Sequence, residues 1–276
     1  MGVLADFNGD NKPDVAFVTP TVTPYDSSVF LFLSVPAPVS LQATIVSSAN
    51  AAALGVSPGS LATAYGTDLA STVAGATPLP LPTSFGGTSI SIVDSSGATS
   101  SAQLLYVSPA QVNFEVPPGS VIGAAQATVT SGDGTKSTAI VNIEPVAPGV
   151  FQLNGSGLAA ADVIVYHADG TSTAEQVYAV NSSGAIVASP VSLGSSTDQA
   201  YLVIYGTGFQ AAGTAGVKVS VNGSSVQVQY AGPQGGFVGL DQANVLLPAS
   251  LAGKGNVSIQ LTANGLVANG VNITIQ

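Results

Sequence analysis

Apolar and small polar residues alternate along most of the chain, in short runs that Gly, Pro, Asn and Asp interrupt. No segment keeps the 3.6-residue spacing of a long helix. Period-two alternation of this kind is typical of strands that bury one face of a sheet. The sequence therefore predicts an all-β fold in which sheets stack as sandwiches. The clearest runs are residues 88–93, 127–130, 217–221 and 257–262.

Two sequence landmarks occur twice and in the same order, which indicates a duplicated domain. Residues 60–69 and 200–209 are strand-like runs that contain Tyr-Gly-Thr, and Gln-x-Asn-x-x-x-Pro occurs at residues 111–117 and 242–248. Each copy has roughly the size of an immunoglobulin-like sandwich. We expect three regions: a β-hairpin with a Pro-containing linker at residues 1–38, and two tandem immunoglobulin-like domains at residues 39–146 and 147–276.

Charged residues make up only 7% of the chain, and the formal net charge is −10. The four basic residues are all lysines, which is too few to displace counterions from a nucleic acid or to bind an anionic membrane. No apolar run approaches the ~18 residues of a membrane-spanning helix. The chain contains no Cys, so thiolate metal sites, Cys nucleophiles and disulfides are excluded.

One acidic segment near the N-terminus has the spacing of a cation site. Side-chain oxygens occur at relative positions 1, 3, 5 and 9, and the carbonyl of the residue at position 7 can supply another ligand. Ca²⁺ prefers six to eight hard oxygen ligands and tolerates irregular geometry. The alternative is a solvated acidic turn whose metal, if any, only holds the hairpin together. The expected ligands are Asp6, Asn8, Asp10, Lys12 (through its backbone carbonyl) and Asp14.

Two apolar strands are predicted directly after this acidic segment, at residues 14–19 and 28–34. A two-stranded hairpin is marginally stable in water, and these strands are too apolar to stay exposed. They must pack on their own chain or on another molecule. In the second case residues 14–34 would add to the sheet edge of a second copy. A contact of that kind, repeated head to tail, makes a filament.

Several of these segments resemble known families. Residues 58–69, Pro-Gly-Ser-Leu-Ala-Thr-Ala-Tyr-Gly-Thr-Asp-Leu, resemble the opening strand of IPT/TIG domains. Residues 42–276 resemble the tandem C-terminal module of secreted or surface proteins of Acidobacteria such as Solibacter. Residues 6–14 resemble the calcium loop of FG-GAP/VCBS repeats, with Asn11 where that family usually has Gly. These resemblances imply immunoglobulin-like domains, a secreted or cell-surface location and a structural Ca²⁺, and they imply no activity.

We expect no enzyme. His167 is the one histidine, and Asp169 two residues later could orient it, but no nucleophile motif accompanies them. The acidic residues Glu115, Glu144 and Glu175 are scattered, whereas glycoside hydrolysis needs two carboxylates across a cleft. The amides of Gln111/Asn113 and Gln242/Asn244 share one face of each strand, and we expect them to bond to loop backbone.

These observations favour an extracellular structural or interaction protein. The leading hypothesis is a self-assembling filament or surface-layer subunit that is joined by donation of its N-terminal strands to a neighbouring copy. The alternative hypothesis is a C-terminal adhesion or ligand-binding module of a larger cell-surface protein.

Overall fold

The computed structural model describes residues 2–7, 13–20, 27–33, 40–53, 55–76 and 79–276. Strands form nearly all the regular structure of these residues, so the all-β prediction is confirmed. The helical elements among them are the short helix α1 (Gly213–Gly216) and the 3-10 turns η1 (Gln210–Ala212) and η2 (Ala249–Leu251). The chain divides into two compact units, Met1–Val39 and Ser40–Gln276.

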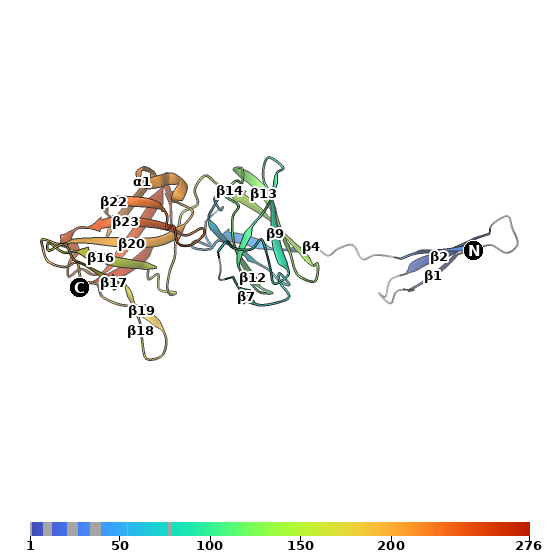
Figure 1. Cartoon of the computed structure of the whole chain (residues 1–276), viewed down its shortest axis with the longest axis horizontal. Coiled ribbons are helices and arrows are strands. Elements are labelled where there is room, and N and C mark those ends of the chain that lie inside the picture. Colours follow the sequence, from blue (N-terminus) through green and yellow to red (C-terminus); the bar gives the residue numbers. More distant parts are fainter. Residues whose placement is uncertain (1, 8–12, 21–26, 34–39, 54, 77–78) are drawn as a thin grey trace. The chain divides into compact units, whose positions relative to one another are not determined.

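The N-terminal unit is an antiparallel sheet with β2 (Asp14–Pro20) between β1 (Gly2–Ala5) and β3 (Ser27–Phe32) (Figure 1). β2 and β3 are the two strands that the sequence predicted. β1 is a correction to the expected hairpin, because its four residues are too few to show an alternating pattern. Ala5 pairs with Asp14, so the acidic segment connects β1 to β2.

The first half of the second unit contains two sheets. One has the order β10-β9-β13-β14-β4 with β8 beside β9, and the other has the order β5-β6-β12-β11-β7. A buried apolar cluster that includes Ile90, Leu104 and Phe114 draws on both sheets, which gives a sandwich-like architecture. The strands are β4 (Ser40–Gln42), β5 (Thr44–Ser47), β6 (Leu61–Tyr65), β7 (Ala74–Gly75), β8 (Ser84–Phe85), β9 (Thr88–Val93), β10 (Thr99–Ser101), β11 (Gln103–Val107), β12 (Gln111–Glu115), β13 (Gly123–Thr130) and β14 (Lys136–Ile143).

The second half has the strand order β17-β16-β20-β23-β22-β21-β24-β25, with β15 beside β20 and β26 beside β24. β22 pairs with β21 through its first residues and with β23 through its later ones, so it passes from one layer to the other. β18 and β19 form a separate pair. The strands are β15 (Gly149–Val150), β16 (Ala161–Tyr166), β17 (Ser172–Gln176), β18 (Tyr178–Val180), β19 (Ile186–Ala188), β20 (Gln199–Thr207), β21 (Val217–Val221), β22 (Ser224–Pro233), β23 (Asp241–Leu247), β24 (Gly255–Ala263), β25 (Leu266–Val267) and β26 (Val271–Ile275).

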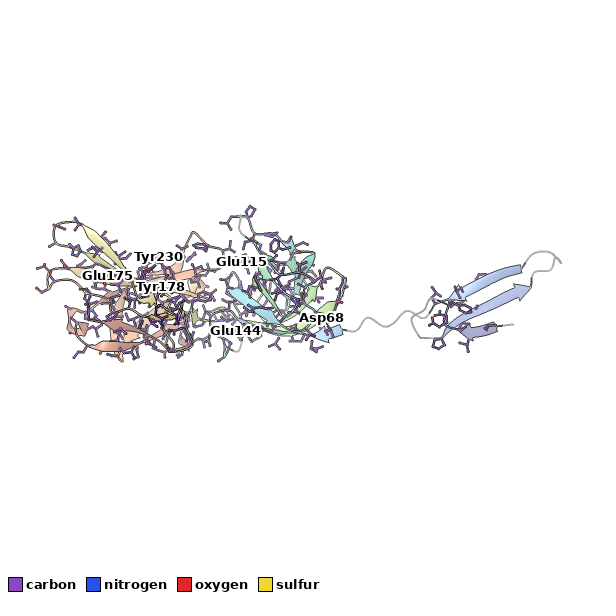
Figure 2. All side chains as sticks on the ribbon, turned by 90° about the horizontal axis from the view of Figure 1, so that it is seen from below. Asp68, Glu115, Glu144, Glu175, Tyr178 and Tyr230 are labelled. Atoms are coloured by element: carbon purple, nitrogen blue, oxygen red, sulfur yellow. The ribbon has the colours of Figure 1, made fainter. Side chains whose placement is uncertain are left out.

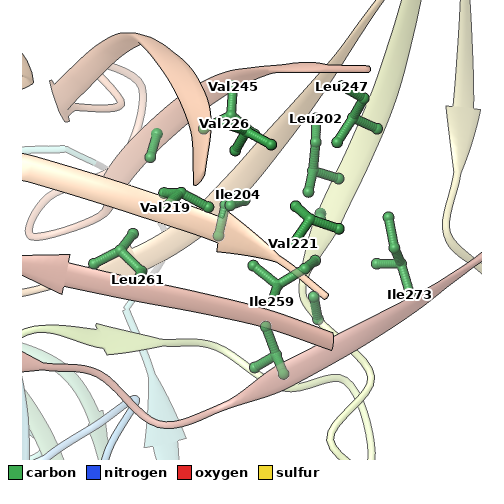
Figure 3. Close-up of a cluster of buried hydrophobic side chains, with 14 of the residues drawn as sticks. Leu202, Ile204, Val219, Val221, Val226, Val245, Leu247, Ile259, Leu261 and Ile273 are labelled. Atoms are coloured by element: carbon green, nitrogen blue, oxygen red, sulfur yellow. The ribbon is translucent and has the colours of Figure 1, made fainter. Parts of the chain in front are cut away.

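Alternating burial holds these layers together. Every second side chain of β9 and of β23 is buried, as the period of a strand requires. Figure 3 shows the result in the second half, where Leu202, Val219, Val245 and Ile259 from four strands meet in one apolar cluster. The four strands predicted from alternation all form, as β9, β21 and parts of β13 and β24. The buried cluster of the first half extends from Val56 to Ile143, and that of the second half extends from Val146 to Ile275.

The two halves repeat one pattern of strand pairing. Tyr65 of β6 lies opposite Gln111 of β12, and Tyr205 of β20 lies opposite Gln242 of β23. The strand that precedes each Gln-containing strand has a bulge, in which one extra residue interrupts the pairing. The extra residues are Leu105 in β11 and Gln229 in β22. A tyrosine follows each of them and pairs with the asparagine of the landmark: Tyr106 with Asn113, and Tyr230 with Asn244.

The turn after each Tyr-Gly-Thr sequence shows how the two copies differ. Asp68 and Gly208 both have positive φ, 54° and 83°, and each precedes a buried side chain, Leu69 or Phe209. A Cβ atom added to Gly208 would collide with the carbonyl oxygen of Ala147. Asp68 carries a side chain at the corresponding position, since Asp tolerates the left-handed region better than most residues. Glycine is thus required at this turn in the second half only.

The geometry of the turn predicts that substitution by alanine costs more stability at Gly208 than at Asp68. We expect Gly208→Ala to lower the free energy of unfolding by about 3 kcal/mol or more, because positive φ and the Ala147 carbonyl both oppose a Cβ. The matched control Asp68→Ala keeps a Cβ that is already accommodated, and we expect a loss of about 1 kcal/mol. Urea denaturation of both variants measures this difference. Equal losses would show that the backbone approach at Gly208 is not the constraint.

Candidate functional site

The acidic connection between β1 and β2 brings two of the predicted ligands close in the sheet. Asp6 directly follows β1 and is exposed, whereas Asp14 begins β2 and is fully buried. The Phe7 N–H donates to Asp14 Oδ2 over 2.9 Å. A buried carboxylate requires such partners, because its transfer out of water is costly. Both carboxylates therefore lie at the base of one connection.

The remaining predicted ligands, Asn8, Asp10 and Lys12, lie outside the described residues. Across the described part of the chain, no group of three or more His, Asp or Glu side chains gathers as a metal site. The calcium site therefore stays a prediction, with Asp6 and Asp14 as its two described residues.

The N-terminal sheet exposes large apolar side chains on both faces. Strand pairing places Leu4, Val15 and Phe32 in one row on the same face, and these side chains are 70%, 41% and 56% exposed. Val3 and Leu31 lie in the next row on the opposite face and are about half exposed. A contiguous apolar surface of this kind commonly marks an interaction site.

His167 lies at the surface directly after β16, as expected, but its partner was wrongly predicted. Its Nδ1 lies 3.1 Å from Asp198 Oδ2, and its Nε2 lies 3.2 Å from Thr173 Oγ1. A hydrogen bond from the Ser195 amide, and then the one from His167, lower the pKa of Asp198 to about 2. Asp169 instead accepts hydrogen bonds from Thr171 in the adjacent turn. His167 is thus part of a hydrogen-bonded surface loop.

The repeated Gln and Asn side chains bond to each other, which corrects the expectation that they bond to loop backbone. Gln111 Nε2 donates to Asn113 Oδ1 over 2.8 Å, and Gln242 Nε2 donates to Asn244 Oδ1 over 2.7 Å. All four side chains are half-buried. The two halves therefore have the same hydrogen bond between uncharged side chains on corresponding strands, β12 and β23.

Hydrogen bonds join the two halves at the turn that follows β20. The Leu61 N–H donates to Thr207 Oγ1 over 2.8 Å, and this hydroxyl donates to the Gly239 carbonyl over 2.7 Å. Gln210 Nε2 donates to the Gly59 carbonyl over 3.1 Å. Thr207 is fully buried, whereas Leu61, Gln210 and Gly239 are partly exposed.

A buried carboxylate organises this joint. Asp241 begins β23 and is fully buried, and its Oδ2 accepts hydrogen bonds from the N–H groups of Phe209 and Gln210, over 2.7 and 3.0 Å. Its Oδ1 is also buried and has no hydrogen-bond partner among the described residues. Burial raises the pKa of Asp241 to about 7. The carboxyl group therefore fixes the backbone of the turn that carries Gln210 to the first half.

A hollow of about 680 Å³ lies beside the joint and is lined by residues of both halves. Glu115 lines it together with Asp241, and burial also raises the pKa of Glu115. Figure 2 labels Glu115 on the first half. Gln103, Gln210 and the exposed Phe237 complete the polar and aromatic lining. The hollow thus contains two acids that gain protons more readily than free carboxyl groups do.

Asp241 lies directly before the repeat landmark at residues 242–248 and is not part of it. Aligning the two landmarks could have identified Asp241, because it corresponds to Ala110 in the first copy. There the carbonyl of Pro109 accepts the hydrogen bond from Leu69, as Asp241 accepts the one from Phe209. A charged residue that replaces a small one at a buried turn indicates a local change of role.

No protein-family model matches the chain, and no curated protein matches it. Within the described residues, no helix has the length and the apolar character needed to cross a bilayer. The geometry of the described residues therefore carries the functional proposal.

The pKa of Asp241 predicts a pH-dependent stability. Because its pKa is about 7 in the folded chain, whereas an aspartate free of such burial has a pKa of 3.8, the folded state holds the proton more tightly between these pH values. We expect the free energy of unfolding to fall as pH rises through about 7, and Asp241→Asn to remove this part of the fall. Thermal melts from about pH 5 to about pH 8 measure it.

The pKa of Glu115 is also raised by burial, so Glu115 can contribute to the same fall in stability. The variant Glu115→Gln separates its contribution from that of Asp241. The carboxylates with lowered pKa, such as Asp198, lose their contribution only at more acidic pH. If Asp241→Asn melts with the same pH dependence as the wild type, the carboxyl group does not titrate as described.

Proposed function

We propose that the chain is an extracellular structural protein that assembles into a filament or surface layer through its N-terminal sheet. One copy provides this sheet, through residues 14–34, and the next copy accepts it. The observation that carries the proposal is the exposure of apolar side chains on both faces of the sheet. Two immunoglobulin-like domains would form the body of the subunit, and the resemblance to secreted surface proteins supports the location.

The N-terminal sheet is small and has three strands among the described residues. A small sheet becomes stable when an apolar face packs against a second layer. Leu4 and Phe32 on one face, and Val3 and Leu31 on the other, remain exposed within the described residues. A second copy would supply the missing layers and bury these side chains.

The edges of the sheet support the same conclusion. Natural sheets protect their edges with lysines, prolines or inward-pointing charges. The outer strands β1 and β3 have the sequences Gly-Val-Leu-Ala and Ser-Ser-Val-Phe-Leu-Phe, which contain no charged residue and no proline. Addition of a strand at either edge would therefore meet no built-in obstacle.

The second unit offers a matching apolar surface as the acceptor. A hollow of about 490 Å³ is lined by Leu61, Leu81, Leu105 and Leu240, with Phe237 beside them at 71% exposed. None of its lining residues is charged, as is true of β1 and β3. Since donor and acceptor are different surfaces, the contact is heterologous, and repetition without closure gives a linear assembly.

A calcium ion at the acidic connection would strengthen the donor sheet. Asp6 and Asp14 at the base of the connection, with Asn8, Asp10 and the Lys12 carbonyl, would supply the oxygen ligands. The buried carboxylate of Asp14 supports this assignment, because bound Ca²⁺ would balance its charge. The ion would fix β1 against β2 and would have a structural role.

Assembly is tested with two defective variants that complement each other. We expect Phe32→Asp to remove the donor surface and Phe237→Asp to remove the acceptor surface, so each variant alone stays near the chain mass of 27.0 kDa in light scattering. An equimolar mixture should form dimers and stop there, because each variant keeps one intact surface. The wild type should form longer species that are visible by electron microscopy.

Ile140→Asp is the matched control, because Ile140 is an apolar strand residue of the second unit and is 75% exposed. It should assemble like the wild type. A wild type that stays monomeric at high concentration would contradict the proposal and favour the alternative, an adhesion or ligand-binding module of a larger surface protein. Assembly that survives Phe237→Asp would refute this acceptor surface alone.

Calcium binding is tested by thermal melting of the full chain. We expect millimolar Ca²⁺ to raise the melting temperature of the N-terminal unit relative to EGTA, because a ligand that binds only the folded state stabilises it. Asp14→Asn keeps an oxygen acceptor for the Phe7 amide but removes the charge, and it should abolish the shift. Mg²⁺ in place of Ca²⁺ is the control. Equal melting temperatures in Ca²⁺ and EGTA would exclude the site.

A further inference from the structure

The outer face of the sheet in the second half contains a third hollow, which the proposed assembly does not use. It has a volume of about 460 Å³ and lies over β16, β20, β22 and β23. Its lining combines tyrosines and amide side chains with apolar residues and includes no charged side chain. The polar and aromatic lining residues are Tyr166, Gln199, Tyr201, Gln229 and Asn244.

Strand register brings these side chains together. Tyr166 of β16 lies opposite Gln199 of β20, and Val203 of β20 lies opposite Asn244 of β23. Tyr201 lies two residues from each of its β20 neighbours in the hollow, so all three point to the same face. Gln229, the extra residue of the bulge in β22, also lines the hollow and is exposed.

The two tyrosines form an aromatic corner. The rings of Tyr166 and Tyr201 have centroids 5.6 Å apart and planes at 83°, and Tyr166 is 51% exposed. The Tyr201 hydroxyl donates to Gln199 Oε1 over 3.1 Å, which orients that amide. The sheet thus holds the exposed ring of Tyr166 nearly perpendicular to the ring of Tyr201.

We propose that this hollow binds a neutral oligosaccharide. Sugar hydroxyls donate and accept hydrogen bonds, as the amides of Gln199, Gln229 and Asn244 do. The apolar C–H face of a sugar ring can pack on an exposed tyrosine ring. The absence of charge from the lining disfavours anionic and cationic ligands, since no side chain there balances their charge. A purely apolar ligand would remove these three amide side chains from water without offering them a hydrogen bond.

The first half provides an internal comparison. The bulge there contributes Leu105 where the second half has Gln229, although the flanking pairs of Tyr with Asn are the same. Leu105 lines an apolar hollow with Leu61 and Leu81. The bulge residue thus differs in polarity between two copies of the same pairing pattern. This difference assigns the polar hollow to the second half alone.

Binding is tested on the full chain with soluble oligosaccharides, so that assembly of the protein cannot be mistaken for binding. The probes are the neutral hexasaccharides of β-1,4-linked and α-1,4-linked glucose, with an oligogalacturonate of similar length as the acidic comparison. Titration calorimetry should show binding of at least one neutral probe and none of the acidic one. Gln229→Leu and Tyr166→Ala should each weaken it about tenfold or more.

Ile140→Gln, at an exposed strand residue of the first half that lines neither hollow, is the control and should leave the affinity unchanged. Folding of each variant is checked by its melting temperature, and both altered side chains of the hollow are exposed. The proposal is overturned if neither neutral probe binds, if the acidic probe binds better, or if Gln229→Leu binds as the wild type does. None of these outcomes depends on whether the chain assembles.

Discussion

Burial of alternating side chains between two sheet layers is the interaction on which the folded chain depends. With charged residues at 7% and no cysteine, ion pairs and disulfides contribute little or nothing. In the second unit, every second residue of strands such as β9 and β23 enters an apolar cluster, and a second layer covers it. The strands of the N-terminal sheet are also rich in apolar residues, but no second layer covers them among the described residues. This difference between the two units is the physical basis of the proposed assembly.

The two halves of the second unit share one pattern of strand pairing and differ at a few positions. Pairing of Tyr65 with Gln111 and of Tyr205 with Gln242 is common to both copies. The differences occur where pairing is interrupted: at the bulge, and at the turn where a carboxylate replaces a backbone acceptor. Such positions change without loss of the core, because the buried alternation does not depend on them. Asp241 ties the turn to its own half, and Gln210 in that turn contacts the other half.

The sequence predicted the all-β fold and the location of several strands, since both depend on local alternation and on turn residues. It missed β1, whose four residues show no period, and it offered Asp169 as a residue that could orient His167, where the structure has Asp198. Asp198 lies 31 residues away, and only tertiary structure brings it to the ring. The amide pairs and the joint at Asp241 also depend on register between distant strands. Sequence spacing predicts which residues share a strand face, but not what lies opposite.

The central claim is that another copy covers the N-terminal sheet, and hydrogen exchange tests it most directly. The backbone amides of β1 and β3 that point away from β2 exchange slowly only when another strand or a second layer protects them. Exchange measured over a range of protein concentrations should show protection of residues 27–33 that increases with concentration, while protection of β20 and β23 stays constant. Protection of residues 27–33 that is the same at every concentration would contradict the account.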